Sequence, residues 1–135
     1  MKNYAVEYVI KANCQESKGT RAVRAESAKE ACQMVEALVH KEMGRNAFRP
    51  KARALDFSGV TQSLINDRLN YLLLSIDDAW DNEAFYAGRD EERRIFWEAR
   101  RFELGAKILH EKTEAKKAGY VVHITDNGKA FAVRA

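Results

Sequence analysis

The chain has few of the residues that mark a secreted, membrane or metal-binding protein. Its 135 residues include only two cysteines, Cys14 and Cys32, and neither has a Cys or His neighbour at metal-ligand spacing. We therefore expect free thiols in a reducing cytoplasm, and neither a metal ion nor another cofactor. No apolar run approaches the roughly 20 residues of a bilayer span. The start, Met-Lys-Asn-Tyr-Ala-Val-Glu, lacks the apolar core of a signal peptide, so we expect no contact with a membrane.

A large excess of one charge sign is also missing, since the net charge of the chain is +3. Residues 1–57 hold 11 Lys and Arg against 7 Asp and Glu, residues 58–92 hold 2 against 8, and residues 93–135 hold 10 against 5. This basic, acidic, basic order predicts either blocks that neutralise one another or two surfaces of opposite sign.

What the sequence does have is an apolar stripe in its middle. Between Leu64 and Trp80, large apolar residues recur every three or four positions, which is the period of an amphipathic helix. We expect Ser58 or Thr61 to cap this helix, and the stripe to join the two ends of the chain in one core. The stripe consists of Leu64, Ile65, Leu69, Leu72, Leu73, Ile76 and Trp80.

The first 57 residues predict a small antiparallel sheet. Lys2–Ala12 alternates apolar and polar residues and predicts a strand, whereas the polar Asn13–Gly19 predicts a loop. Thr20–Ala25 predicts a second strand, antiparallel to the first because the connection is short. Phe48–Phe57 predicts a third strand, which should lie at a sheet edge because Pro50 cannot donate to a ladder.

A helix is expected between the second and third strands. Ser27 and Glu30 form a capping box, in which the Ser27 hydroxyl accepts from the Glu30 amide and the Glu30 carboxylate accepts from the Ser27 amide. The helix should end near Met43, with Gly44 in a left-handed conformation. Residues 1–57 therefore predict the order β-β-α-β.

A second long helix is expected after an acidic connector. We expect Asp77–Gly88 to hold a short turn of helix with a buried aromatic, and Asp90 to cap a helix that ends at Ala118. Gly105 lies inside this helix at a cost of about 1 kcal/mol relative to Ala, which indicates a close helix crossing. The expected inward stripe is Ile95, Ala99, Phe102, Ala106 and Leu109.

The last residues predict a β-hairpin. Asn127-Gly128 favours a two-residue type I′ turn, because both positions of that turn need positive φ. This turn pairs Asp126 with Lys129, and it gives the hairpin an apolar face that the N-terminal sheet or the helices must cover. The predicted face is Tyr120, Val122, Ile124, Phe131 and Val133.

Together these elements predict an α+β fold, with a small antiparallel sheet packed on two long helices. The strands come from the β-β-α-β part and the hairpin. We find no linker and expect a single domain over residues 1–135, made of a β-β-α-β part (1–57), a helical part (58–118) and the hairpin (119–135).

Two groups of basic residues are candidate binding surfaces. The first, around the third strand, could deter edge-to-edge pairing or bind a nucleic acid or an acidic protein. The second lies along the long helix and could track phosphates, or could form ion pairs with Glu98 and Glu103 at helical spacing. The first group is Arg21, Arg24, Arg45, Arg49, Lys51 and Arg53, and the second is Arg93, Arg94, Trp97, Arg100 and Arg101.

Catalytic and metal sites are not indicated. The acidic cluster of Asp77, Asp78, Asp81 and Glu83 lacks the glycine and the spacing of a calcium-binding loop. The histidines are scattered, and no third group is available to orient a nucleophile and its base. The pattern therefore favours a protein without enzymatic activity.

The sequence favours a small cytoplasmic binding or regulatory protein that contacts a nucleic acid or a nucleoprotein complex through its Arg- and Lys-rich surfaces. The alternative is a protein–protein adaptor or inhibitor, homodimeric or encoded by a phage or other mobile element. Such a protein would use an aromatic surface around Trp97, Phe85 and Tyr86. An enzyme of unknown type is the least favoured hypothesis.

Overall fold

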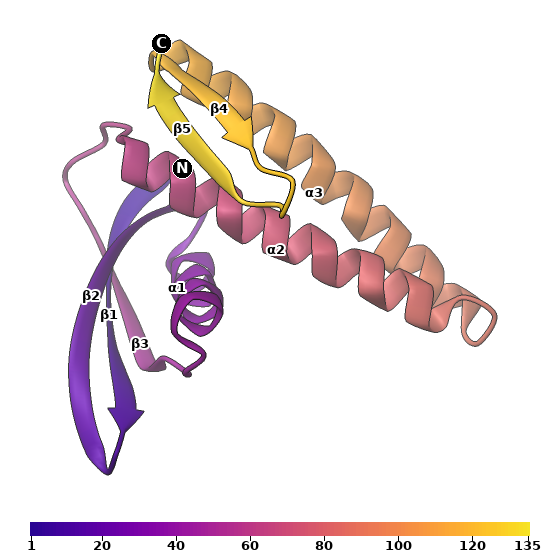
Figure 1. Cartoon of the computed structure of the whole chain (residues 1–135), viewed down its shortest axis with the longest axis horizontal. Helices are drawn as coiled ribbons and strands as arrows, with labels where there is room; N and C mark the ends of the chain where they lie inside the picture. Colours follow the sequence, from indigo (N-terminus) through magenta and orange to yellow (C-terminus); the bar gives the residue numbers. More distant parts are fainter. The chain divides into compact units, whose positions relative to one another are not determined.

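The fold combines three helices with two separate antiparallel sheets, which confirms the α+β class (Figure 1). The computed structural model describes residues 1–135 as two compact units, which divide at Arg68 and Leu69 inside the middle helix. The single domain stays a prediction. No helix has both the length and the apolar content that crossing a membrane requires. The elements are β1 (Lys2–Ala12), β2 (Gln15–Ala25), α1 (Ala28–Met43), β3 (Phe48–Ala54), α2 (Gln62–Tyr86), α3 (Glu91–Lys117), β4 (Tyr120–Ile124) and β5 (Ala130–Arg134).

The sheet of the first unit (Met1–Arg68) has the strand order β2-β1-β3, and both outer strands are antiparallel to β1. The loop expected over Asn13–Gly19 is wrong, because β2 already begins at Gln15. Asn13 and Cys14 have φ values of 52° and 63°, as the two central residues of a type I′ turn require. Residues 13–18 are exposed, so their polar character belongs to a hairpin end in solvent and not to a loop.

β3 lies at the edge of this sheet, as Pro50 predicted, and it is irregular there. The pairing register shifts between Glu7 and Val9 of β1. Arg49 and Pro50 lie opposite this shift, and Arg49 has a φ of 51°. Such a bulge removes a residue from the regular alternation of faces.

α1 begins with half of the predicted capping box. The Glu30 amide donates to the Ser27 hydroxyl (3.1 Å), and Gly44 ends the helix at a φ of 66°. The Glu30 carboxylate accepts from the Glu26 amide (2.8 Å) and not from Ser27 as predicted, and it also accepts from the guanidinium of Arg68 (2.6 Å). Arg68 is only 1 % exposed, so Glu30 neutralises a buried cation.

α2 confirms the central helix but extends further than predicted. Thr61 and not Ser58 caps it, since the Leu64 amide donates to the Thr61 hydroxyl (3.3 Å). The helix continues to Tyr86, so the connector expected over Asp77–Gly88 is wrong. The acidic residues of that segment therefore lie on a helix surface.

Burial along the second half of α2 also differs from the prediction. Trp80, the expected end of the stripe, is 52 % exposed, and Ala79 is buried in its place. A buried aromatic was expected in the segment that contains Phe85 and Tyr86, but Phe85 is 56 % exposed and Tyr86 is only partly buried. In the second unit (Leu69–Ala135), Leu72 and Ala79 form a buried cluster with Leu104 of α3.

α3 has nearly the predicted bounds but turns its opposite face inward. The Asp90 side chain accepts from the Arg93 amide (3.2 Å) and caps the helix as expected. Leu104 is buried, and Trp97 and Ile108 pack against the same cluster. The expected inward stripe is wrong, because all five of its residues are exposed. These are Ile95, Ala99, Phe102, Ala106 and Leu109.

The β4–β5 hairpin packs beside α3 and does not join the first sheet (Figure 1). Its register is one residue away from the prediction, because Ile124 pairs with Ala130. The Gly128 amide donates to the Thr125 carbonyl (2.9 Å), and only Gly128 of the loop has positive φ, 80°. The connection is therefore a three-residue loop, a type I turn followed by a left-handed glycine.

This one-residue shift exchanges the two faces of β5 relative to β4. The predicted pair Asp126–Lys129 and the predicted apolar face are consequently wrong. Tyr120 is buried as expected, but Phe131 and Val133 lie on the other side and are 39 % and 37 % exposed. The small residues Ala130 and Ala132 take the buried positions on β5.

Candidate functional site

The first sheet has one covered and one open face. α1 packs against all three strands, and Val6, Val23 and Ala25 are fully buried. Because side chains alternate along a strand, the residues between these point to the opposite side. The register then sets Val9 beside Lys18 and aligns the other open positions in rows. We term this surface the open face. It consists of Glu7, Val9, Lys11, Glu16, Lys18, Thr20, Arg24, Lys51 and Arg53.

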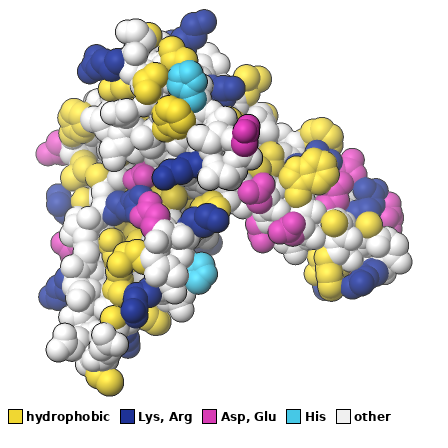
Figure 2. Space-filling view, in the orientation of Figure 1, with side chains coloured by type: hydrophobic (Ala, Val, Ile, Leu, Met, Phe, Trp, Pro, Cys, Tyr) yellow, Lys and Arg dark blue, Asp and Glu magenta, His cyan; other side chains and the backbone are white.

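Positive charge predominates on the open face. Its carboxylates are those of Glu7 and Glu16, and Glu16 pairs with Arg49 (3.1 Å) at the bulge. Exposed pairs of this kind contribute about 0–1 kcal/mol, so they restrain the cations only weakly. Figure 2 shows Lys and Arg side chains spread along the strands of the first unit. The open-face cations that form no ion pair within the chain are Lys11, Lys18, Arg24, Lys51 and Arg53, of which Lys11 lies over the Phe48 ring.

Two aromatic side chains border the open face. Phe48 pairs in register with Val9 and is 39 % exposed, and the Lys11 ammonium lies 5.0 Å from its ring centroid. Phe57 is 56 % exposed, and its backbone carbonyl accepts from Nδ2 of the Asn3 side chain (3.0 Å), which ties this segment to β1. Aromatic rings beside cations offer a stacking surface next to charge.

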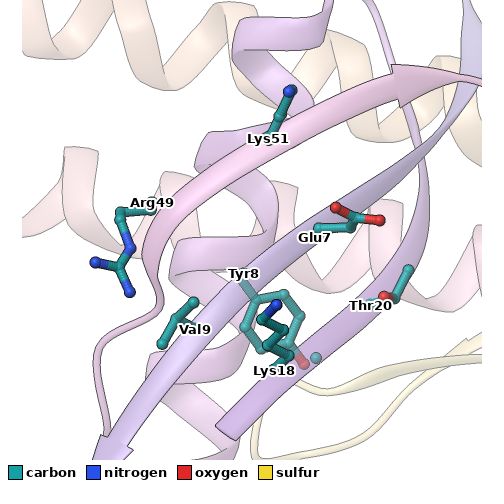
Figure 3. Close-up of a pocket in the computed structure, with 8 residues that line it drawn as sticks. Glu7, Tyr8, Val9, Lys18, Thr20, Arg49 and Lys51 are labelled. Carbon is teal, nitrogen blue, oxygen red and sulfur yellow. The ribbon is translucent and has the colours of Figure 1, made fainter. Parts of the chain in front are cut away.

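A hollow of ≈ 400 Å³ lies on the open face (Figure 3). A Cβ atom at Gly19 would lie 2.5 Å from Cζ of Tyr8, so the ring leaves no space for a side chain there. The cations around the hollow could hold an anionic group. It is lined by Glu7, Tyr8, Val9, Lys18, Gly19, Thr20, Arg49 and Lys51.

The structure distributes the first predicted group of cations over several surfaces. Arg24, Lys51 and Arg53 lie together on the open face. Regular strand alternation would place Arg49 on the same side as Lys51 and Arg53, but the bulge removes it from that alternation. Arg45 follows α1 and donates to the Lys11 carbonyl (3.5 Å).

Arg21 lies on the covered side of the sheet. Its guanidinium pairs with Glu42 (2.7 Å) and Asp67 (2.9 Å), and its side chain is 19 % exposed. The hydrogen bonds to Glu42 and then to Asp67 raise the pKa of Arg21, against the opposing effect of burial. This cation is therefore neutralised within the first unit.

Every arginine of the second group, on α3, forms an ion pair. Arg94 contacts Glu91 (2.7 Å) and Glu98 (2.6 Å), and hydrogen bonds to these carboxylates raise its pKa. Arg101 pairs with Glu83 of α2 (2.8 Å). The other pairs are Arg93–Asp90 (3.4 Å) and Arg100–Glu103 (3.2 Å). Trp97 packs against the buried cluster, so the structure does not bring it beside free cations.

No arrangement of titratable groups indicates catalysis. No group of three or more His, Cys, Asp or Glu side chains is placed to hold a metal ion. Burial raises the pKa of the Cys32 thiol, which disfavours the reactive thiolate. His123 stacks on Phe131 with a centroid separation of 5.3 Å, and His40 and His110 are exposed on two different helices.

Sequence reasoning missed Lys11 and Lys18 as members of the open face. Lys18 was assigned to a loop, yet Glu16, Lys18, Thr20 and Arg24 already follow the period of two that marks one side of a strand. That alternation could have indicated from the sequence that β2 begins before Lys18.

Comparison with known proteins adds no assignment. Protein-family models, curated protein sequences and solved structures give no match to this chain. The function must therefore be inferred from the chain's own geometry.

Proposed function

We propose that the protein is a non-catalytic binding protein that holds a single-stranded nucleic acid on its open face. The observation that supports this most is the group of Lys18, Arg24, Lys51 and Arg53 on the two outer strands of the open face, none of which forms an ion pair within the chain. Cations of this kind gain affinity for phosphates by releasing the counterions that surround a nucleic acid.

The aromatic side chains favour a single strand over a duplex. Phe48 and Phe57 are exposed beside the cations, where unstacked bases could contact their rings. Bases in a duplex are already stacked and paired, so they cannot use such rings without being extruded. The hollow beside Lys18 and Lys51 could hold one phosphate.

A cytoplasmic location and a regulatory role belong to the same proposal. Cys14 and Cys32 are free thiols, as is usual in a reducing compartment. A binding protein without catalytic groups would act by covering its ligand. That ligand is either free nucleic acid or nucleic acid within a nucleoprotein complex.

The test is fluorescence anisotropy with a labelled single-stranded oligonucleotide and with the matching duplex. Lys51→Glu combined with Arg53→Glu should weaken binding of the single strand by about tenfold or more, because two phosphate contacts become repulsive. Lys29→Glu is the matched control: Lys29 is exposed on α1, away from the open face, and should leave affinity within about twofold. Equal losses in both variants, or none, would contradict the proposal.

A protein partner is the second candidate. The observation that favours it is the exposure of large apolar side chains along α3, where Phe102 and Leu109 are 63 % and 66 % exposed. Nucleic-acid binding would not explain these residues.

A further inference from the structure

α3 carries an apolar stripe that the rest of its own unit does not cover. Its members are separated by four, three, four, three and four residues, the spacing of the core positions of a coiled coil. We term this set the outer stripe: Ile95, Ala99, Phe102, Ala106, Leu109 and Thr113.

The outer stripe lies opposite the side of α3 that packs inside the unit. Trp97, Leu104 and Ile108 face the buried cluster, and at 100° per residue these positions are on the far side of the helix from the stripe. Ile95 and Phe102 are 52 % and 63 % exposed. An exposed stripe of this length on a 27-residue helix indicates a second packing partner.

We propose that the outer stripe pairs with the outer stripe of a second copy of this chain, antiparallel and related by a two-fold axis. Large and small residues alternate along it, with Ile, Phe and Leu separated by Ala, Ala and Thr. In an antiparallel pair each large residue faces a small one, and the pairs are Ile95 with Thr113, Ala99 with Leu109, and Phe102 with Ala106.

Size complementarity singles out this arrangement. A parallel pair would place Phe102 against its own copy and Ala99 against its own copy, giving an overfilled layer next to an empty one. An antiparallel pair shifted by one heptad would bring Leu109 opposite the carboxylate of Glu92. The two-fold arrangement centred at Leu104 alone fills every layer with one large and one small residue.

Charges at the two ends of the outer stripe and along one flank agree with the same register. Glu92 and Lys116 continue the spacing of the stripe at its ends, and Glu92 becomes level with Lys116 of the second copy. On the flank, Glu98 lies across from Lys112 of the second copy. Glu92, Lys112 and Lys116 are exposed and have no ion pair within their own chain. Opposite charges at such flanking positions set the orientation of helix pairs.

Gly105 fits the close approach of two helices on this side. A Cβ atom there would meet no atom within 4 Å, so the close crossing that the sequence indicated does not occur within the chain. In the proposed pair, Gly105 lies next to Gly105 of the second copy, near the axis. The close contact between the two helices would then offset the loss of about 1 kcal/mol in helix stability that a glycine causes relative to alanine.

The size of the contact fits a modest homodimer. The outer stripe spans 19 residues, Ile95 to Thr113, or about 27 Å of helix. Two such stripes with their charged flanks bury roughly 1,200 Å², the lower limit of standard interfaces. We therefore expect dimers to form at concentrations below about 1 mM.

Sedimentation equilibrium tests the contact. The wild-type chain should move from 15.4 kDa towards twice that mass as concentration rises, and Phe102→Glu should remain monomeric. Phe85→Glu is the matched control, because Phe85 is similarly exposed, at 56 %, on α2. A wild-type chain that stays monomeric up to about 1 mM, or a Phe102→Glu chain that still dimerises, would overturn the proposal.

Charge reversal tests the orientation without relying on one disruptive variant. Glu98→Lys and Lys112→Glu should each weaken self-association by at least about fivefold, since like charges then face each other twice. Mixing the two variants should restore dimers, because every facing pair is then opposite in sign. If the mixture stays monomeric while each variant is weakened, the antiparallel register is wrong. All these variants keep the open face, so oligonucleotide binding by their monomers tests the proposed function separately.

Discussion

Asn70 of α2 holds Ala130 at the start of β5 through two hydrogen bonds. Its Nδ2 donates to the Ala130 carbonyl (2.9 Å), and its Oδ1 accepts from the Ala130 amide (2.8 Å). The side-chain amide thus supplies the donor and the acceptor that a neighbouring strand would otherwise supply at the edge of the hairpin. Ala130 is 1 % exposed, so no water can readily replace these bonds.

Asn70→Ala should lower the free energy of unfolding by about 1–3 kcal/mol, because it leaves a buried amide and a buried carbonyl unpaired. Asn70→Asp should lower the free energy of unfolding by less at neutral pH, since the carboxylate can still accept a hydrogen bond from the Ala130 amide. Asn82→Ala is the control, because Asn82 only donates to the Asp78 carbonyl at the surface of α2. Urea denaturation measures all three, and equal stability of Asn70→Ala and wild type would contradict this role for Asn70.

Cys14 adopts a φ of 63° in the β1–β2 turn, a conformation that costs a non-glycine residue about 1–2 kcal/mol. Cys14→Gly should therefore stabilise the protein, by up to about 1 kcal/mol after the larger chain entropy of glycine is included. Thermal unfolding measures the change. A lower melting temperature for Cys14→Gly would mean that the turn differs from type I′.

Gly128 and Asn127 distinguish the observed hairpin loop from the predicted one. Only Gly128 has positive φ, 80°, so Gly128→Ala should cost about 1 kcal/mol while Asn127→Ala costs a few tenths. A type I′ turn at these positions would make both substitutions costly, because both residues would need positive φ. Parallel denaturation curves of the two variants decide between the registers.

Glu83 makes the second unit sensitive to acid. Its hydrogen bond with Arg101 lowers the pKa of Glu83 below its usual value of 4.5. A carboxyl whose pKa is lowered by folding stabilises the native state above pH 4.5, and this contribution is lost as the pH falls through the lowered value. Glu83→Gln should therefore be less stable than wild type near neutral pH, and the difference should disappear between about pH 5 and pH 3. A difference that is constant with pH would exclude the ion pair as its cause.

Local patterns predicted the elements well, because local interactions form them. The capping residues Ser27 and Asp90 and the helix-ending Gly44 each act within one turn of their own helix. Pro50 predicted the edge position of β3 because proline has no backbone N–H to donate to a neighbouring strand, and this property belongs to a single residue. These features need no knowledge of the rest of the chain.

The errors arose where two patterns competed. α3 has apolar residues on two opposite sides, and hydropathy alone favoured the richer stripe with Ile95 and Phe102 over the one with Leu104 and Ile108. Asn127-Gly128 fits two loop types that differ by one residue in register, and that difference exchanges the two faces of β5 relative to β4. Tertiary packing decides such cases, as it does for the buried Arg68.

The candidate site was predictable only in part. Arg24, Lys51 and Arg53 follow strand alternation and were identified, whereas Arg21 follows the opposite alternation and pairs with Glu42 and Asp67. Those carboxylates lie 21 and 46 residues away from Arg21, a separation at which sequence spacing carries no information.

The salt dependence of binding to a single-stranded oligonucleotide tests the central claim most directly. If Lys18, Arg24, Lys51 and Arg53 of the open face contact phosphates, the logarithm of the binding constant should fall with the logarithm of salt concentration with a slope of about −3. The Lys51→Glu/Arg53→Glu variant should reduce the slope to near −1. A slope near zero for the wild-type chain, or the same slope in both proteins, would show that the open face does not bind nucleic acid.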